Sequence, residues 1–129
     1  MPVKLDPFVA MGGTEFSVSP DDILRTHGRP WRSDRNGVGL NEMDYGHVVY
    51  RFQDSGRLEE ITVRAEVVAI GNVAVPFEAL AGFIRGQDPE AFERAGFLVS
   101  PGFGLAFDPR EPFWVTALAR HCLPEWVAL

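Results

Sequence analysis

Residues 48–63 read VVYRFQDSGRLEEITV, and this stretch decides the fold class. The apolar side chains of Val48, Tyr50 and Phe52 alternate with more polar ones, which is the period of a strand that buries one face. Residues 54–56, Asp-Ser-Gly, then supply a turn before a second strand pattern begins. The stretch therefore predicts an antiparallel β-hairpin.

A similar order of signals recurs later in the chain. Pro20 and Pro76 each open a helical pattern and lie 56 residues apart, while Phe52 and Phe107 each end an apolar strand and lie 55 residues apart. Few of the matched side chains are identical, so the repeat is one of pattern. It predicts two halves, each a helix plus a hairpin, that share one sheet.

The composition is that of one globular domain. The chain has 129 residues, of which 46% are hydrophobic and 23% are charged. We therefore predict a single α+β domain over residues 1–129, with pseudo-repeats at about 16–63 and 70–119.

Three segments carry helix signals. A capping serine followed by proline predicts a helix over residues 20–27, and an apolar stripe with helical spacing predicts one over residues 77–85. A shorter helix is expected to begin at Asp88 and to end at Gly96. Residues 28–40, rich in Gly and Arg, are expected to form an irregular connection.

The other apolar segments predict an antiparallel sheet with the short helices on one face. The sheet is built mainly from residues 43–63 and 97–119. Because so few helical residues cannot cover both faces, one face is expected to stay open. The predicted core consists of Ile23, Leu24, Phe52, Ile61, Phe77, Leu80, Ile84, Phe92, Phe107 and Val115.

No catalytic or cofactor signature is recognisable. His27, His47 and His121 are isolated from one another, and none has a metal-ligand spacing. Cys122 is the only cysteine, which excludes an internal disulfide, and no cationic cluster is evident to activate its thiol. We therefore expect a protein that is not an enzyme, with no catalytic residue, no cofactor and no metal.

The net charge of −6 bears on the partner. It disfavours nucleic-acid binding by phosphate neutralisation and favours a protein partner with a basic surface. No stretch has the length and apolarity of a signal peptide or a membrane span. We therefore expect a cytoplasmic protein that binds neither nucleic acid nor membrane.

Four residues are candidates for partner binding: Asp44, Glu59, Glu60 and Trp114. The three acids lie on or beside the central hairpin, where they would steer a basic partner. Glu59 and Glu60 are neighbours on a strand, so they are expected to point to opposite faces. An exposed Trp114 would be a binding anchor. The alternative is an acidic surface that merely aids solubility.

Three motifs follow one another in residues 16–63: a capped helix that begins after Ser19, the loop Gly28-Arg29-Pro30, and a strand–turn–strand from Tyr45. This order resembles the β-lactamase-inhibitor-protein-like superfold, in which tandem copies form a long sheet whose concave face grips another protein. The chain is also similar to small bacterial immunity proteins encoded with polymorphic toxins. The disulfides of the secreted inhibitors are absent, so the resemblance implies neither β-lactamase inhibition nor particular site residues.

These observations favour a non-enzymatic protein-binding module, and the leading expectation is a cytoplasmic immunity protein that neutralises a toxin. One alternative is a small-molecule-binding domain with a pocket between helix and sheet, lined by Trp31, Tyr50 and Trp114. The other is a structural homo-oligomer, such as a homodimer formed by edge-to-edge pairing of exposed strands.

Overall fold

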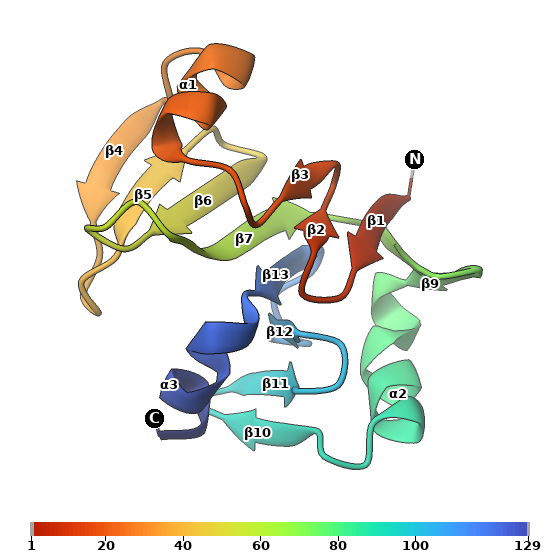
Figure 1. The fold of residues 1–129 in the computed structure, drawn as a ribbon. Helices are drawn as coiled ribbons and strands as arrows, with labels where there is room; N and C mark the ends of the chain where they lie inside the picture. The colour runs from red at the N-terminus through yellow and green to blue at the C-terminus, as the bar shows by residue number, and fades with distance from the viewer. Residues whose placement is uncertain (1, 129) are drawn as a thin grey trace.

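The computed structural model describes residues 2–128 and is built around an eight-stranded antiparallel sheet (Figure 1). Its strands are β4 (Arg32–Arg35), β5 (Asn41–Asp44), β6 (Val48–Phe52), β7 (Leu58–Arg64), β10 (Phe92–Arg94), β11 (Phe97–Ser100), β12 (Leu105–Phe107) and β13 (Trp114–Leu118). Their order across the sheet is β10-β11-β12-β13-β7-β6-β5-β4. The predicted hairpin is β6 and β7, and the two parts of the chain meet where β7 pairs with β13.

A second sheet of five strands is made from the N-terminus and the middle of the chain. Its strands are β1 (Val3–Asp6), β2 (Ala10–Met11), β3 (Thr14–Glu15), β8 (Val67–Ile70) and β9 (Val73–Pro76). The order is β3-β2-β1-β8-β9, and only β1 and β8 run parallel. The protein is therefore mixed α+β with mostly antiparallel sheets.

Two helices match the predicted positions. They are α1 (Pro20–His27) and α2 (Phe77–Gln87), which lie at opposite ends of the molecule (Figure 1). α1 begins with a capping box, because Ser19 Oγ accepts a hydrogen bond from the Asp22 amide and the Asp22 carboxylate accepts one from the Ser19 amide. It ends at Gly28, whose φ of 77° suits glycine.

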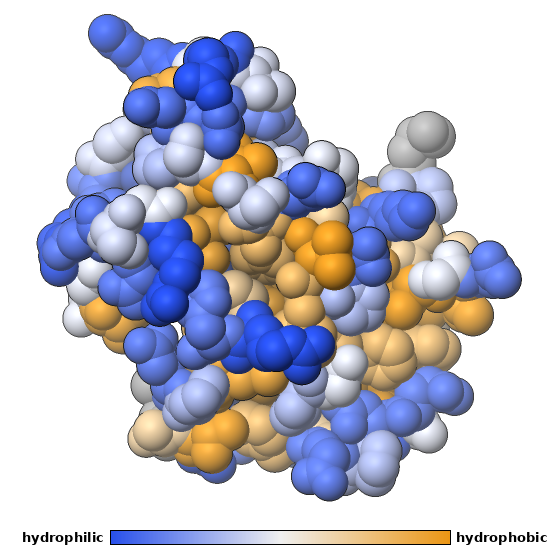
Figure 2. All heavy atoms as spheres, viewed as in Figure 1, coloured by the Kyte–Doolittle hydropathy of each residue, from blue (hydrophilic) through white to orange (hydrophobic). Residues whose placement is uncertain are grey.

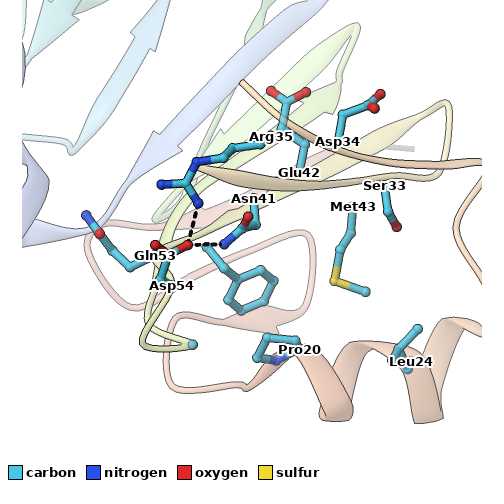
Figure 3. A pocket seen from close by; sticks show the side chains of 12 residues that line it. Pro20, Leu24, Ser33, Asp34, Arg35, Asn41, Glu42, Met43, Gln53 and Asp54 are labelled. Carbon is cyan, nitrogen blue, oxygen red and sulfur yellow. Dashed lines mark hydrogen bonds and ion pairs between the residues drawn. The ribbon is translucent and has the colours of Figure 1, made fainter. Parts of the chain in front are cut away.

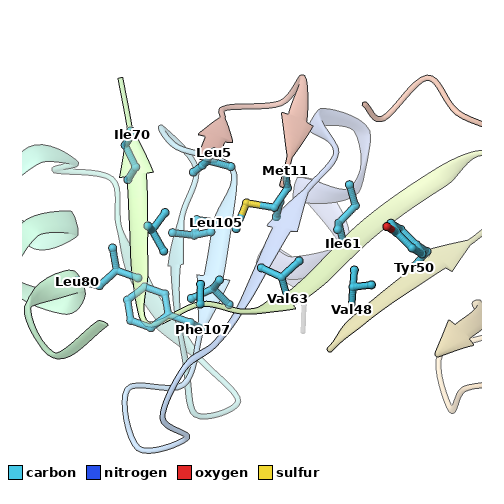
Figure 4. Packing of buried hydrophobic residues seen from close by; sticks show 14 of the residues in the cluster. Leu5, Met11, Val48, Tyr50, Ile61, Val63, Ile70, Leu80, Leu105 and Phe107 are labelled. Atoms are coloured by element: carbon cyan, nitrogen blue, oxygen red, sulfur yellow. The ribbon is translucent and has the colours of Figure 1, made fainter. Parts of the chain in front are cut away.

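α1, α2 and the five-stranded sheet all pack on one face of the eight-stranded sheet. In Figure 4, Leu5 and Met11 of the smaller sheet point toward Ile61 and Leu105 of the larger one. Leu80 of α2 is fully buried in the same cluster. This closed face therefore holds one apolar core to which both halves of the chain contribute.

A short C-terminal segment covers part of the opposite face. It consists of η1 (Arg120–Cys122) and α3 (Leu123–Ala128), and its apolar side chains pack on β11, β12 and β13. The prediction of an open face is therefore wrong beneath this segment, which also reaches β7 through Trp126 and Glu60. None of the helices formed by residues 2–128 packs on the same face over β5 and β6. Nine residues are too few to show helical periodicity in the sequence.

Two predicted local structures are wrong. No helix spans Asp88 to Gly96, because residues 92–94 form β10 and pair with β11. The Asp88 carboxylate instead accepts hydrogen bonds from Ser100 Oγ at 2.6 Å and the Gly102 amide at 2.9 Å, which ties the end of α2 to the sheet. Within residues 28–40, expected to be irregular, β4 pairs with β5.

Most of the predicted core is confirmed. The eight buried members are Ile23, Phe52, Ile61, Phe77, Leu80, Ile84, Phe107 and Val115. Leu24 is 43% exposed, because it lies one position round α1 from Ile23 and faces a groove. Phe92 is half-buried, since it lies on the edge strand β10 beneath the guanidinium of Arg94.

The free edge at β4 is strongly polar. All four of its residues, Arg32, Ser33, Asp34 and Arg35, are exposed. Figure 2 shows hydrophilic residues over α1 and β4, and apolar residues toward the middle of the same view. Charged side chains on an edge strand discourage pairing with another strand, so this edge disfavours a homodimer built by sheet extension.

Both halves of the chain place one helix before four antiparallel strands of the large sheet. The central pairing sets Thr62 opposite Thr116, which is a separation of 54 residues. In the five-stranded sheet β1 and β8 pair parallel, and these strands lie before or at the start of the two predicted repeats. The pseudo-repeat therefore stays a prediction, and it concerns the eight-stranded sheet alone.

Candidate binding site

A pocket of about 260 Å³ lies where the uncovered sheet face meets α3. Its floor is formed by Arg51, Thr62 and Thr116, its aromatic walls by Phe97, Trp114 and Trp126, and its carboxylates by Glu60, Asp108 and Glu111. These residues come from β6, β7, β11, β13, α3 and the loop before β13. The pocket is thus assembled from segments that are distant in the sequence.

Strand pairing explains why the floor residues point the same way. Arg51 lies opposite Glu60, and Thr62 lies opposite Thr116. Directly opposed residues on neighbouring strands project from the same face of a sheet. The alternation that buries Ile61 on the closed face therefore brings these four polar side chains to the open one.

The floor is held by a chain of hydrogen bonds across four strands. Arg51 donates from Nε to Glu42 Oε2 at 2.6 Å and from Nη1 to Thr62 Oγ1 at 2.5 Å. The hydroxyls of Thr62 and Thr116 are 2.8 Å apart. A network whose members all have partners is rigid, so the floor is a pre-organised surface.

Glu60 is the carboxylate that lies deepest in this pocket. Its side chain is 15% exposed, and its Oε2 accepts a hydrogen bond from Trp126 Nε1 at 3.2 Å. Burial raises the pKa of Glu60 above its usual value, because the nearby Arg51 and the Trp126 hydrogen bond do not fully compensate and Glu59 adds repulsion. A further cation placed here would be attracted to it.

The aromatic wall depends on the C-terminal helix. Trp126 of α3 packs against Phe97 of β11, with 5.5 Å between the ring centroids and a tilt of 59°. Trp114, the first residue of β13, is half-buried and lines the same pocket. Aromatic side chains in this arrangement offer large contact areas to a partner.

A second pocket of about 290 Å³ adjoins the first and shares Glu60 and Trp126 with it. Its other lining residues are Val38, Leu40, Gln53 and Glu125, and Val38 is 73% exposed. We call the two pockets together the trough. The trough runs from the β4–β5 loop, past Trp126, to Trp114.

The structure places the predicted partner-binding residues in different environments. Glu60 and Trp114 meet in the first pocket of the trough. Asp44 lies on β5 outside it, where its carboxylate accepts a hydrogen bond from the Gly46 amide and faces Arg32 at 3.6 Å. Sequence reasoning missed Trp126, whose only signal was an apolar pattern in a tail too short to interpret.

Glu59 is not the solvated rim charge that its position suggested. It is 1% exposed and is held by Arg57 at 3.1 Å and by an ion-pair contact with His121. Strand alternation accounts for this, because Glu59 lies two residues before the buried Ile61 and so points to the same side of β7. A bulge in the β6–β7 pairing, where Arg51 faces Glu60 and Phe52 faces Leu58, also leaves Glu59 without an opposite residue.

The pocket predicted from Trp31, Tyr50 and Trp114 does not form. Tyr50 is buried on the closed face beside His27 and Tyr45, while Trp114 lies on the open face. Trp31 is 80% exposed at the edge of the sheet. One sequence cannot reveal which faces such distant aromatic residues share.

A different groove of about 500 Å³ separates α1 from the β4–β5 hairpin (Figure 3). Leu24 and Met43 line it, and at its rim Asp54 accepts hydrogen bonds from Arg35 at 2.6 Å and Asn41 at 2.9 Å. These rim groups bond to one another and are exposed or partly exposed to water. They therefore do not converge on a ligand as the polar groups of a small-molecule site do.

Cys122 is a structural thiol. Burial, with the nearby charges of Glu60, Glu59 and Glu125, raises its pKa to about 12, and its Sγ lies 3.0 Å from the Ala119 carbonyl. It stays protonated at neutral pH and is a poor nucleophile. Within residues 2–128, no three His, Cys, Asp or Glu side chains gather to hold a metal ion.

None of the helices formed by residues 2–128 combines the length and the apolarity needed to cross a membrane. No protein-family profile, no curated protein and no solved structure matches this chain. Its own geometry defines an α+β protein whose large sheet carries an aromatic and acidic trough on its open face.

Proposed function

We propose that this chain is a non-enzymatic protein-binding module, a cytoplasmic immunity protein that neutralises a bacterial toxin by holding it on the trough. The observation that carries the proposal is the meeting of Glu60, Trp114 and Trp126 on the uncovered face of the sheet. Aromatic anchors in a central depression with polar groups around them are typical of protein interfaces.

Charge supports a basic partner. The chain carries a net charge of −6, and the trough is lined by Glu60, Asp108, Glu111 and Glu125. Long-range attraction would speed the encounter with a basic toxin, and the aromatic residues would then slow its release.

The order of elements supports the resemblance seen in the sequence. One helix before four strands occurs in each half, and joining the two meanders at β7 and β13 makes a sheet eight strands wide. In this proposal the two halves are pseudo-repeats, and the broad sheet they form is the platform on which a partner lies.

Co-expression with the product of the adjacent gene tests the proposal. We expect the wild-type chain to bind that product in size-exclusion chromatography and to restore growth when the product is toxic. Trp114→Ala should weaken binding by about 30-fold, which corresponds to about 2 kcal/mol for an interface anchor. Trp31→Ala is the matched control, because Trp31 is exposed and lies outside the trough.

Two results would contradict this proposal. One is that the adjacent product neither binds nor is neutralised. The other is that Trp31→Ala abolishes binding while a folded Trp114→Ala variant binds normally, which would move the interface to the β4 edge.

A small-molecule-binding domain is the second candidate, and the groove between α1 and the β4–β5 hairpin favours it. A ligand there would contact Leu24 and Met43. Mass spectrometry of the natively purified protein would then show a bound metabolite that the Leu24→Glu variant does not retain.

A further inference from the structure

The pocket of about 260 Å³ combines aromatic walls with an excess of carboxylates. Its lining contains three aromatic residues with large rings, three carboxylates and one guanidinium, that of Arg51. Ring faces attract cations through their quadrupole, and carboxylates attract them directly. The lining therefore favours a positively charged occupant over a neutral or an anionic one.

Two of the carboxylates are available to such an occupant. Asp108 is already paired with Arg110 at 3.0 Å. Glu111 is exposed and forms no ion pair with any other residue in the range 2–128. Glu60 has only a 3.5 Å contact with Arg51, whose Nε is committed to Glu42 at 2.6 Å. Glu60 and Glu111 are thus short of positive charge.

The volume of the pocket and the arrangement of its lining favour a single arginine side chain as the occupant. The pocket is smaller than the roughly 300 to 1,000 Å³ of small-molecule sites. A guanidinium is planar, weakly hydrated and rich in donors, so it stacks on indole rings and bonds carboxylates at the same time. A lysine ammonium is compact and strongly hydrated, and it cannot stack.

We propose that this pocket receives one arginine side chain of the bound protein, with the guanidinium between Trp114 and Trp126 and its N–H groups donated to Glu60 and Glu111. This assignment rests on the proposed function, because it specifies which side chain of the bound protein occupies the trough. The raised pKa of Glu60, caused by burial, is consistent with a carboxylate whose burial the charge of Arg51 does not fully offset in the free protein.

A titration with an arginine analogue tests the pocket without the partner. The probe is N-acetyl-arginine methylamide, added to the full chain carrying Trp31→Phe, which leaves Trp114 and Trp126 as the only tryptophans. We expect a saturable shift of both indole N–H resonances. The citrulline analogue, which has the same shape without the charge, and the lysine analogue should each bind at least about tenfold more weakly, a difference of about 1.4 kcal/mol.

A carboxylate variant provides a second test of the pocket. Glu111→Gln should weaken binding of the arginine analogue by about threefold. Because Glu111 is exposed, the substitution should not change the fold. Equal binding of the citrulline or lysine analogue, or no shift of either indole, would overturn the assignment. If the arginine analogue binds but the adjacent gene product does not, the pocket assignment stands and the immunity role fails.

Discussion

The two faces of the eight-stranded sheet differ in almost every respect. The closed face packs against α1, α2 and the five-stranded sheet and buries large apolar side chains such as Phe52 and Phe107. Among the described residues, η1 and α3 alone cover the open face, which shows a hydrogen-bonded polar floor between aromatic walls. The same strands supply both faces, because successive side chains point in opposite directions.

This difference separates stability from recognition. Large apolar side chains on the closed face remove much surface from water and account for most of the folding free energy. The floor of the open face is polar and pre-organised, so substitutions there should change binding more than folding. Four predictions test this division, from the largest expected effect to the smallest.

Phe52→Ala and Phe107→Ala should each lower the free energy of unfolding by about 3 to 5 kcal/mol, because each empties a large buried space on the closed face. Urea denaturation measures this loss. Val38→Ala, at an exposed position in the trough, should change it by less than about 0.5 kcal/mol. Losses below about 1 kcal/mol for both phenylalanines would refute the division, and with it the equivalence of the two halves.

Asp88→Ala should cost about 2 to 3 kcal/mol, because three hydrogen bonds to a buried carboxylate are lost. Burial alone would raise the pKa of Asp88, but hydrogen bonds from Ser100, Gly102 and Glu90 outweigh it and lower the pKa below 3.8. The stabilisation is therefore present above pH 3.8 and is lost as the pH falls through the lower folded value. Acid titration of stability checks this, with exposed Asp6→Ala as the control.

His121→Ala tests how η1 and α3 are fastened to the open face. It should destabilise by about 2 kcal/mol, because the buried Glu59 carboxylate loses its contact with the His121 ring and keeps only its contact with Arg57. Exposed His47→Ala is the control and should have little effect. Loss of hydrogen-exchange protection in α3 alone would show that this segment opens separately from the rest of the fold. An unchanged midpoint of urea denaturation would mean that the Glu59–His121 contact contributes nothing to stability.

Glu60→Gln should change stability by less than about 1 kcal/mol at neutral pH, and its informative effect is on pH dependence. Burial raises the folded-state pKa of Glu60 above 4.5, so the folded state holds its proton more tightly than the unfolded state does. The wild type should therefore lose stability as the pH rises from 4.5 through the folded value. The variant should lose this part of the pH dependence. If the free energy of unfolding changed with pH in the same way in both proteins, the burial of the Glu60 carboxylate would be contradicted.

The sequence alone predicted the α+β class, the β6–β7 hairpin, the positions of α1 and α2 and eight of ten core residues. These features depend on local signals: strand alternation, a capping serine before proline, and an apolar stripe with helical spacing. Such signals report which side of an element is apolar. They do not report what that side packs against.

The tertiary structure alone decided the site. A bulge left Glu59 without an opposite residue in the β6–β7 pairing, and residues 120–128 folded over the sheet to place Trp126 beside Glu60. The trough joins residues that are as far apart in the sequence as Arg51 and Trp126. The sequence determined which side chains lie outside the core. Strand register and long-range packing determined which of these side chains meet, because the free energy of the whole fold, and no local pattern, decides which segments lie side by side.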